Sequence, residues 1–327
     1  RACAQPCGAL GVRVLTVVDL ILPIFAVVAL GWGATFTPVF DAASARALSG
    51  FVFFFAIPLM LFEKVATTDP VEGGAGALLA TYYAATGIVF VLGALAARLG
   101  FGRRGEEAVL LGFAGAYANT VMVGIPVVLT VIGSEATFAL FLIISFHSLI
   151  FFTLTTVLVE SVRGARAGVR RIAPEVAKGV VTNPILVALV LGVAANRAGL
   201  PLPDLFRDFA QLVGGAAVPC ALFATGAALR QFRVGGALPL VAAVVALKGV
   251  VHPLVTFVLA TQVFALPALF TAVAVVLASL PVGVNPYLFA ARYGVAEAEC
   301  ATAVAISTPL AVVTVSAALV VLGFGGG

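Results

Sequence analysis

Three ionisable side chains lie inside segments that are otherwise apolar: Lys248, His252 and His147. A charge at membrane depth is costly and usually has a function, and a histidine exchanges its proton near neutral pH. Lys248 and His252 are four residues apart, which on a helix places them on one face. These residue types favour anion binding or proton handling. The structural alternatives are a lysine that extends to the membrane surface and histidines that only pack or bond a backbone carbonyl.

The stretch Ala278-Ser-Leu-Pro-Val-Gly-Val-Asn-Pro-Tyr287 interrupts a long apolar run. Pro281 and Pro286 lack an N–H group and crowd the preceding turn, and Gly283 lies between them. In hydrocarbon, freed backbone groups are tolerated only where protein or water satisfies them. The stretch is therefore predicted to line a cavity and to form a binding site. Asn285 is expected to cap a half-helix and to contact a ligand.

A second interrupted run, Gly112 to Pro126, has the same character. Asn119 and Thr120 are its polar residues, Gly124 and Pro126 are expected to break it, and Tyr117 is a weaker ligand candidate beside them. If both runs break near the membrane midplane, the N-termini of two half-helices meet at one site. Such N-termini carry free N–H groups and about half a positive charge. The predicted crossing therefore suits a small anion.

The composition is that of a polytopic membrane protein. Of 327 residues, 62% are hydrophobic and only 10% are charged, and the mean hydropathy is +1.20; soluble domains have about 25% charged residues. A soluble enzyme is thereby excluded, and no nucleotide-binding, zinc-protease or Ser-His-Asp pattern is present. We expect no cofactor, no metal and no nucleic-acid partner. The net charge of +4 is explained by arginines between the spans.

Ten membrane spans of about 20 residues are predicted, the length that crosses about 30 Å of hydrocarbon. Their approximate limits are 14–33, 44–65, 75–98, 106–131, 136–160, 178–197, 208–229, 235–263, 267–291 and 296–322.

The two halves of the chain resemble each other. A shift of 161 residues places prolines, glycines, an arginine and a phenylalanine of the first half on the same residue types of the second: Pro23 on Pro184, Gly31 on Gly192, Arg46 on Arg207, Pro58 on Pro219, Phe62 on Phe223 and Gly133 on Gly294. Because each half has an odd number of spans, the second enters the membrane from the opposite side. We therefore predict inverted repeats over residues 1–160 and 178–327, joined by a basic cytoplasmic loop at 161–177.

Loop charges predict the orientation. Most of the 18 lysine and arginine residues fall between spans on one face, including Arg163, Arg166, Arg170 and Arg171. This face is expected to be cytoplasmic, which places both termini outside. Of the four cysteines, Cys3 and Cys7 lie in the N-terminal tail and could pair there, whereas Cys220 and Cys300 are expected to pack inside spans.

The two interrupted runs resemble motifs of the auxin efflux carrier family, which includes the plant PIN carriers. Ala118-Asn-Thr-Val-Met-Val-Gly-Ile-Pro126 resembles the family's fourth-span motif, and Ser279 to Ala290 with Tyr293 resembles its ninth-span motif. Shorter matches occur at Leu22-Pro-Ile-Phe25, Ile57-Pro58, Asn183-Pro184 and Ala217-Val-Pro219. Lys248 and His252 resemble the bacterial branch, whose members are described as malonate or malate permeases.

The resemblance implies an all-α fold like that of bile-acid symporters, with ten transmembrane helices and discontinuous helices four and nine that cross. It implies a scaffold domain of spans 1, 2, 6 and 7, which also forms a homodimer, and a transport domain of spans 3–5 and 8–10 that moves like an elevator. The family's fourth-span asparagine falls on Asn119, its crossing proline on Pro286 and its polar fifth-span position on His147. Ala118 replaces a proline and Asn285 an apolar residue of the plant carriers.

We therefore predict a secondary transporter of small organic anions, mono- or dicarboxylates such as malonate or malate, in the bacterial inner membrane. The predicted substrate-binding residues are Asn119, Thr120, Tyr117, His147, Lys248, His252 and Asn285, and the crossing residues are Gly124, Pro126, Pro281, Gly283 and Pro286. No Asp or Glu lies well inside a predicted span, so protons, exchange or the membrane potential are expected to drive transport. The alternatives are a carrier of auxin-like aromatic carboxylates, a membrane sensor and a channel.

Overall fold

The computed structural model describes residues 7–68, 73–163, 178 and 181–324. Over these residues the chain is helical, and the one extended contact is an isolated bridge between Ala118 and Val282. The predicted all-α class is thereby confirmed. Cys3 and the basic loop from residue 164 to 177 lie outside the described residues, so the predictions made for them stay predictions.

The helices of the first half are mostly long, and several contain a wider, π-helical turn. They are α1 (Cys7–Ala34), α2 (Ala42–Phe51), η1 (Val52–Ala56), α3 (Ile57–Thr67), α4 (Ala75–Leu95), η2 (Ala96–Gly100), α5 (Glu106–Ala116), η3 (Thr120–Gly124), α6 (Ile125–Val131), η4 (Ser134–Ala136) and α7 (Thr137–Val162).

The second half also consists of α-helices, some of which contain a π-helical turn. Its helices are α9 (Pro184–Arg197), α10 (Asp204–Gly215), α11 (Ala217–Leu229), α12 (Leu238–Ala246), η5 (Leu247–Val251), α13 (His252–Val258), η6 (Leu259–Val263), α14 (Ala268–Ser279), α15 (Asn285–Tyr293) and α16 (Glu297–Val321). Asn183 caps α9, since its side-chain oxygen accepts hydrogen bonds from the backbone N–H groups of Ile185 and Leu186.

Among the described residues, 7 helices are long and apolar enough to cross a membrane: Val17–Ala34, Ala42–Thr67, Ala75–Gly100, Ser134–Val162, Asp204–Leu229, Leu238–Val263 and Glu297–Val321. Three more apolar helices are shorter, Thr120–Val131, Pro184–Arg197 and Ala268–Ser279. Two of the short ones lie in the interrupted runs, where the chain leaves helical geometry partway across. The molecule is thus a multi-span membrane protein.

Three prolines are the second residue of a helix that directly follows a π-helical turn. Pro58 follows η1, Pro126 follows η3 and Pro253 follows η5. Proline has no N–H to donate and its ring crowds the carbonyl four residues back. A π-helical turn widens the helix at that point, which is a common way for a helix to accept a disturbance. The chain therefore continues through Pro126, which was predicted to break it.

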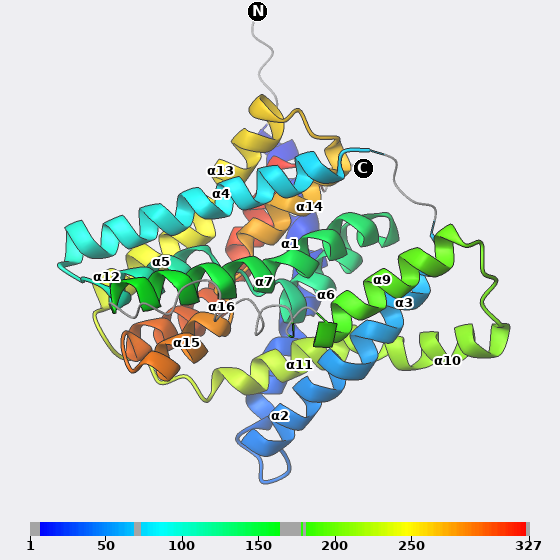
Figure 1. Cartoon of the computed structure of the whole chain (residues 1–327), viewed down its shortest axis with the longest axis horizontal. Helices are drawn as coiled ribbons and strands as arrows, with labels where there is room; N and C mark the ends of the chain where they lie inside the picture. Colours follow the sequence, from blue (N-terminus) through cyan, green and yellow to red (C-terminus); the bar gives the residue numbers. More distant parts are fainter. Residues whose placement is uncertain (1–6, 69–72, 164–177, 179–180, 325–327) are drawn as a thin grey trace, which may run out of the picture.

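Figure 1 shows how the helices are arranged, and we describe them in two sets that also contact each other, for example through α1 and α16. The crossing group contains α4 to α7 and α12 to α16, and the wall group contains α1 to α3 and α9 to α11. Within the wall group, Gly31 of α1 lies against α11: a Cβ added to it would be 2.0 Å from the carbonyl oxygen of Phe223. Gly192 of α9 lies against α3 in the same way, 3.2 Å from the carbonyl oxygen of Phe62.

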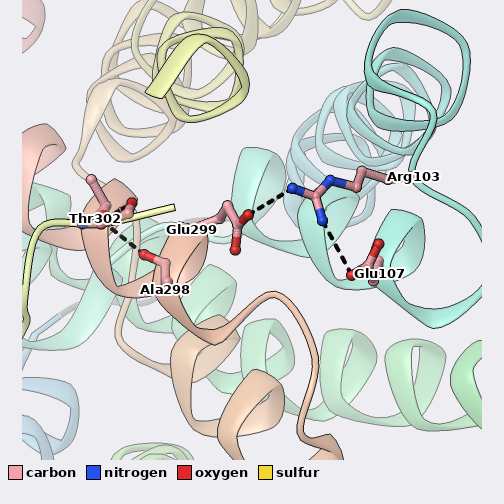
Figure 2. A network of polar contacts seen from close by, with 6 residues as sticks. Arg103, Glu107, Ala298, Glu299 and Thr302 are labelled. Carbon is pink, nitrogen blue, oxygen red and sulfur yellow. Dashed lines mark hydrogen bonds and ion pairs between the residues drawn. The ribbon is translucent and has the colours of Figure 1, made fainter. Parts of the chain in front are cut away.

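Polar contacts tie the helix ends of the crossing group together (Figure 2). Arg103 bridges Glu107 of α5 at 3.3 Å and Glu299 of α16 at 2.9 Å. Arg163, which follows α7, forms an ion pair with Glu106. Acidic residues in the first turns of α5 and α16 also complement their helix dipoles.

Candidate functional site

Two interrupted helices meet in the crossing group. α5 ends at Ala116 and η3 begins at Thr120, while α14 ends at Ser279 and α15 begins at Asn285. The extended residues between them pair: Asn119 N–H donates to Pro281 O, and Gly283 N–H donates to Tyr117 O, both at 3.0 Å. We call residues 117–119 and 280–284 the crossing. Each segment satisfies backbone groups that the other leaves free, as burial in a membrane requires.

The predicted crossing residues divide into two sets. Pro281 and Gly283 lie in the crossing itself, and Pro286 is the second residue of α15. Gly124 and Pro126 lie in the helix after it, because the interruption of the first run covers residues 117–119. Gly124 still faces the other interrupted helix, since a Cβ added to it would lie 2.8 Å from Leu280 Cδ1.

A cavity of about 550 Å³ lies between the crossing and the wall group. Four of the seven predicted binding residues line it: Tyr117, Asn119, Thr120 and Asn285. Further polar residues on its wall come from both groups of helices and were not predicted as binding residues: Arg46, Ser49, Ser148, Asn183, Thr225, Gln231 and Thr308. The cavity is therefore a polar site between two groups of helices.

The N-termini of two helices face this cavity. Val121 and Met122 follow Thr120 in the first turn of η3, and Val284 and Asn285 lie at the start of α15; these four residues line the cavity. Within the described part of the chain, their backbone N–H groups donate no hydrogen bond. The first N–H groups of a helix have no partner inside it, and together with the helix dipole they attract an anion.

Side-chain hydrogen bonds fix the crossing on one side of the cavity. Asn285 Nδ2 donates to the Tyr117 hydroxyl at 2.8 Å, and this hydroxyl also bonds Ser148 Oγ at 2.8 Å. The Asn285 side chain thus does not cap α15, and Asn119 makes no side-chain cap for η3. The prediction that Asn285 caps a half-helix was wrong, because its amide bonds the Tyr117 hydroxyl instead.

His147 lies behind Tyr117, outside the cavity wall. Its ring stacks on the Tyr117 ring at 4.4 Å between centroids with an interplanar angle of 23°. The side chain is fully buried, and neither ring nitrogen has a hydrogen-bond partner among the described residues. His147 can therefore influence a ligand only through Tyr117 in this conformation.

Lys248 and His252 are also fully buried, and they face different neighbours. Lys248 Nζ donates to the carbonyl oxygen of Ala278 near the C-terminal end of α14, where a cation complements the helix dipole. His252 Nε2 lies 3.1 Å from Thr86 Oγ1 of α4. Neither residue lines the cavity at the crossing.

The unpredicted polar residues had weak signals in the sequence. Arg46 begins a span and looks like one of the arginines that set orientation. Ser148 follows His147 directly, and Asn183 directly precedes Pro184 at the start of α9. Their common location depends on how the wall group packs against the crossing, which one sequence does not specify.

Comparison with known proteins identifies the family of the chain. Residues 16–319 match the model of a family described as membrane transport protein. The chain belongs to this family, the auxin efflux carriers, which confirms the resemblance in its motifs. A protein of Rhizobium meliloti (strain 1021), named "Putative malonate transporter", is 28% identical over 312 residues, covering 94% of this chain and 97% of the relative.

Proposed function

We propose that this protein is a secondary transporter of small organic anions, with short dicarboxylates such as malonate or malate as substrates. The observation that carries the proposal is the cavity at the crossing, which combines two helix N-termini with unbonded N–H groups, amide and hydroxyl side chains, and no acidic residue in its described lining. The family and the name of the Rhizobium relative support it.

A substrate carboxylate would bind at the crossing. Its oxygens would accept hydrogen bonds from the N–H groups that open η3 and α15, and from the side chains of Asn119 and Thr120, which line the cavity. Tyr117 would hold Asn285 in place through the hydrogen bond between them. An anion held by dipoles in this way needs no metal and no counter-ion.

Lys248 would act through the helix that it caps. Its ammonium group bonds the Ala278 carbonyl at the end of α14, so it keeps the interrupted helix in shape and adds positive charge behind the crossing. His147 would support Tyr117, on which it stacks, and His252 would join α13 to α4 through Thr86. We therefore assign these three residues a positioning role.

Transport is proposed to follow an elevator mechanism in ten spans arranged as two inverted repeats. The reciprocal contacts of Gly31 with Phe223 and of Gly192 with Phe62 support the repeats, since the 161-residue shift exchanges one contact for the other. The wall group would be the scaffold domain, with its homodimer contact, and the crossing group the transport domain. The proposed orientation places both termini outside the inner membrane, which cysteine labelling from each side would test.

The first experiment is uptake of labelled malonate and malate by reconstituted protein. Saturable uptake is expected, and Asn119→Ala should lower it at least tenfold, since a charge-assisted hydrogen bond is worth about 1.5–3 kcal/mol. Asn196→Ala is a matched control, because Asn196 bonds the backbone at Ala66 and Thr68 away from the crossing. Wild-type protein that binds malonate without moving it would identify a sensor, and uptake that never saturates would identify a channel.

A separate experiment concerns Lys248. Lys248→Met should reduce malonate uptake at least tenfold while the protein stays folded. The methionine side chain has about the length of lysine, so packing is kept, but α14 loses its charged cap. Thermal unfolding in detergent checks the fold. Full uptake by this variant would remove Lys248 from the mechanism.

A second candidate substrate is an aromatic carboxylate. Several aromatic side chains line the cavity beside its polar groups, among them Phe53, Phe152 and Phe232, and they would accommodate an indole ring. Competition between indole-acetate and malonate for the reconstituted protein separates the two candidates.

A further inference from the structure

Arg46 of α2 is the one charged residue in the described lining of the cavity at the crossing. It lies in the second turn of the helix, and its side chain is exposed. Every other polar residue of this lining has an amide or a hydroxyl group. Arg46 thus gives the cavity a full positive charge on the side that faces the crossing.

The nearest acidic residue in the sequence does not neutralise Arg46. The Asp41 carboxylate accepts two hydrogen bonds from Ser44, one from its backbone N–H and one from its hydroxyl, each at 2.8 Å. These bonds lower the pKa of Asp41. None of the four ion pairs found among the described residues includes Arg46. Its guanidinium group is therefore available to a ligand.

The crossing and Arg46 offer two different kinds of anion contact. At the crossing, helix dipoles and neutral side chains can hold one carboxylate. A second carboxylate on the same molecule adds a whole negative charge, which needs a cation when it leaves water. Lys248 is not available for this purpose, because it bonds Ala278 and does not line the cavity.

We propose that Arg46 determines specificity for dicarboxylates: one carboxylate binds at the crossing, and the guanidinium group of Arg46 binds the other. A guanidinium matches a carboxylate with two parallel hydrogen bonds, so arginine suits this task better than lysine. The proposal rests on the proposed function and adds the residue that separates dicarboxylates from monocarboxylates.

The test compares malonate with its monomethyl ester, which keeps the malonate skeleton, adds one methyl group and has one charge less. Binding of both to the purified full-length protein is measured by calorimetry at a pH where all free carboxyls are ionised. Wild-type protein should bind malonate at least about tenfold more tightly than the ester, the factor that one charge-assisted hydrogen bond corresponds to. Arg46→Gln should abolish this preference and leave ester binding unchanged.

Two further variants make the result decisive. Arg207→Gln is the matched control: Arg207 occupies the corresponding position of the second half, pairs with Asp204 in α10 and does not line the cavity. It should keep the full preference for malonate. Arg46→Lys keeps the charge without the guanidinium and should show an intermediate preference; it also replaces Arg46→Gln if that variant does not fold.

The outcomes separate the two proposals. An unchanged preference in the Arg46 variants, or equal binding of malonate and ester by wild-type protein, overturns the role of Arg46 and leaves the carboxylate carrier in place. Wild-type protein that binds neither compound overturns the proposed carboxylate substrate, and the role of Arg46 with it.

Discussion

Tyr117 connects the parts of the site at the scale of one residue. Its carbonyl oxygen accepts from Gly283 N–H in the crossing, its hydroxyl bonds Asn285 and Ser148, and its ring covers His147. The side chain is 4% exposed, so the hydroxyl would be difficult to satisfy with bulk water if these partners were lost. We infer that Tyr117 keeps the two interrupted helices and α7 in register.

Tyr117→Phe tests this inference. The substitution keeps the ring but leaves Asn285 and Ser148 without their shared partner, which for buried groups costs about 1–3 kcal/mol. We expect a lower thermal unfolding temperature and weaker malonate binding. Tyr82→Phe is the control, because the buried Tyr82 hydroxyl has no partner among the described residues and its removal should be neutral or stabilising. Equal effects of both variants would contradict the role of Tyr117.

At the residue scale, the sequence indicated which residues are candidates for the binding site, but it was less informative about which neighbours their side chains contact. The interrupted helices, which drew attention to these residues in the sequence, also form one wall of the cavity. Four predicted binding residues therefore line it: Tyr117, Asn119, Thr120 and Asn285. Lys248 and His252 were expected to share a helix face from their spacing. Lys248 lies inside the π-helical turn η5, which ends directly before His252 and changes the helical period. Lys248 therefore contacts α14, and His252 contacts α4.

At the scale of elements, the crossing depends on how closely two extended segments approach. A Cβ added to Gly283 would lie 2.7 Å from Tyr117 Cδ1 and 3.1 Å from the carbonyl oxygen of Ala118. Real Cβ atoms do not come so close to other atoms without displacing them. Glycine at this position therefore allows the antiparallel bridge between Ala118 and Val282.

Gly283→Ala should consequently destabilise the protein by about 1–3 kcal/mol, the usual range for an overpacked core, and reduce transport. Gly87→Ala in α4 is a suitable comparison, since a Cβ there meets no atom within 4 Å and alanine favours a helix by about 1 kcal/mol over glycine. Thermal unfolding should move in opposite directions for the two variants. A Gly283→Ala protein as stable as wild type would mean that the crossing is looser than described.

The positions of the apolar segments could be predicted from hydropathy and punctuation, because membrane length restricts the possible spans. The site of the first interruption could not. Pro126 was expected to break the run, yet η3 accommodates it, and the chain instead leaves the helix at residues 117–119. No residue in that stretch forbids a helix; pairing with residues 280–284 from the other half decides it.

At the scale of the whole molecule, glycines hold the wall group together. Gly31, Gly192 and Gly226 each bring a helix against the backbone or Cβ of a neighbour, and small residues are typical of close helix contacts in membranes. The largest restriction falls on Gly226, where a Cβ would be 1.8 Å from the carbonyl oxygen of Val28, and on Gly31 at 2.0 Å from Phe223. Helices α1 and α11 therefore contact each other through two glycines, one from each half.

Gly31→Ala should disrupt this contact and destabilise the protein by about 3 kcal/mol or more, because the neighbouring atom belongs to the backbone and cannot rotate away. Gly33→Ala lies in the same helix with no atom within 4 Å of its Cβ and should have little effect. The amount of folded protein after detergent extraction, followed by thermal unfolding, measures both. Similar behaviour of the two variants would refute the close approach of α1 and α11.

The internal likeness of the halves was visible in the sequence as matching prolines and glycines. How the halves pack against each other was not, since two copies of one motif can be arranged in many ways. The cavity has one wall from each group of helices. Arg46 lines it because α2 lies opposite the crossing, and the sequence does not show this placement.

A cavity with walls on two separate groups of helices also sets a limit on what the protein can move. If the two groups of helices slide past each other during transport, a compound bound to both must release one of them before the groups can move. Short, weakly bound molecules would be transported, whereas longer diacids that bind Arg46 and the crossing tightly at the same time would hold the protein in one conformation. Extending the spacer between two carboxylates is therefore a rational route from substrate to inhibitor.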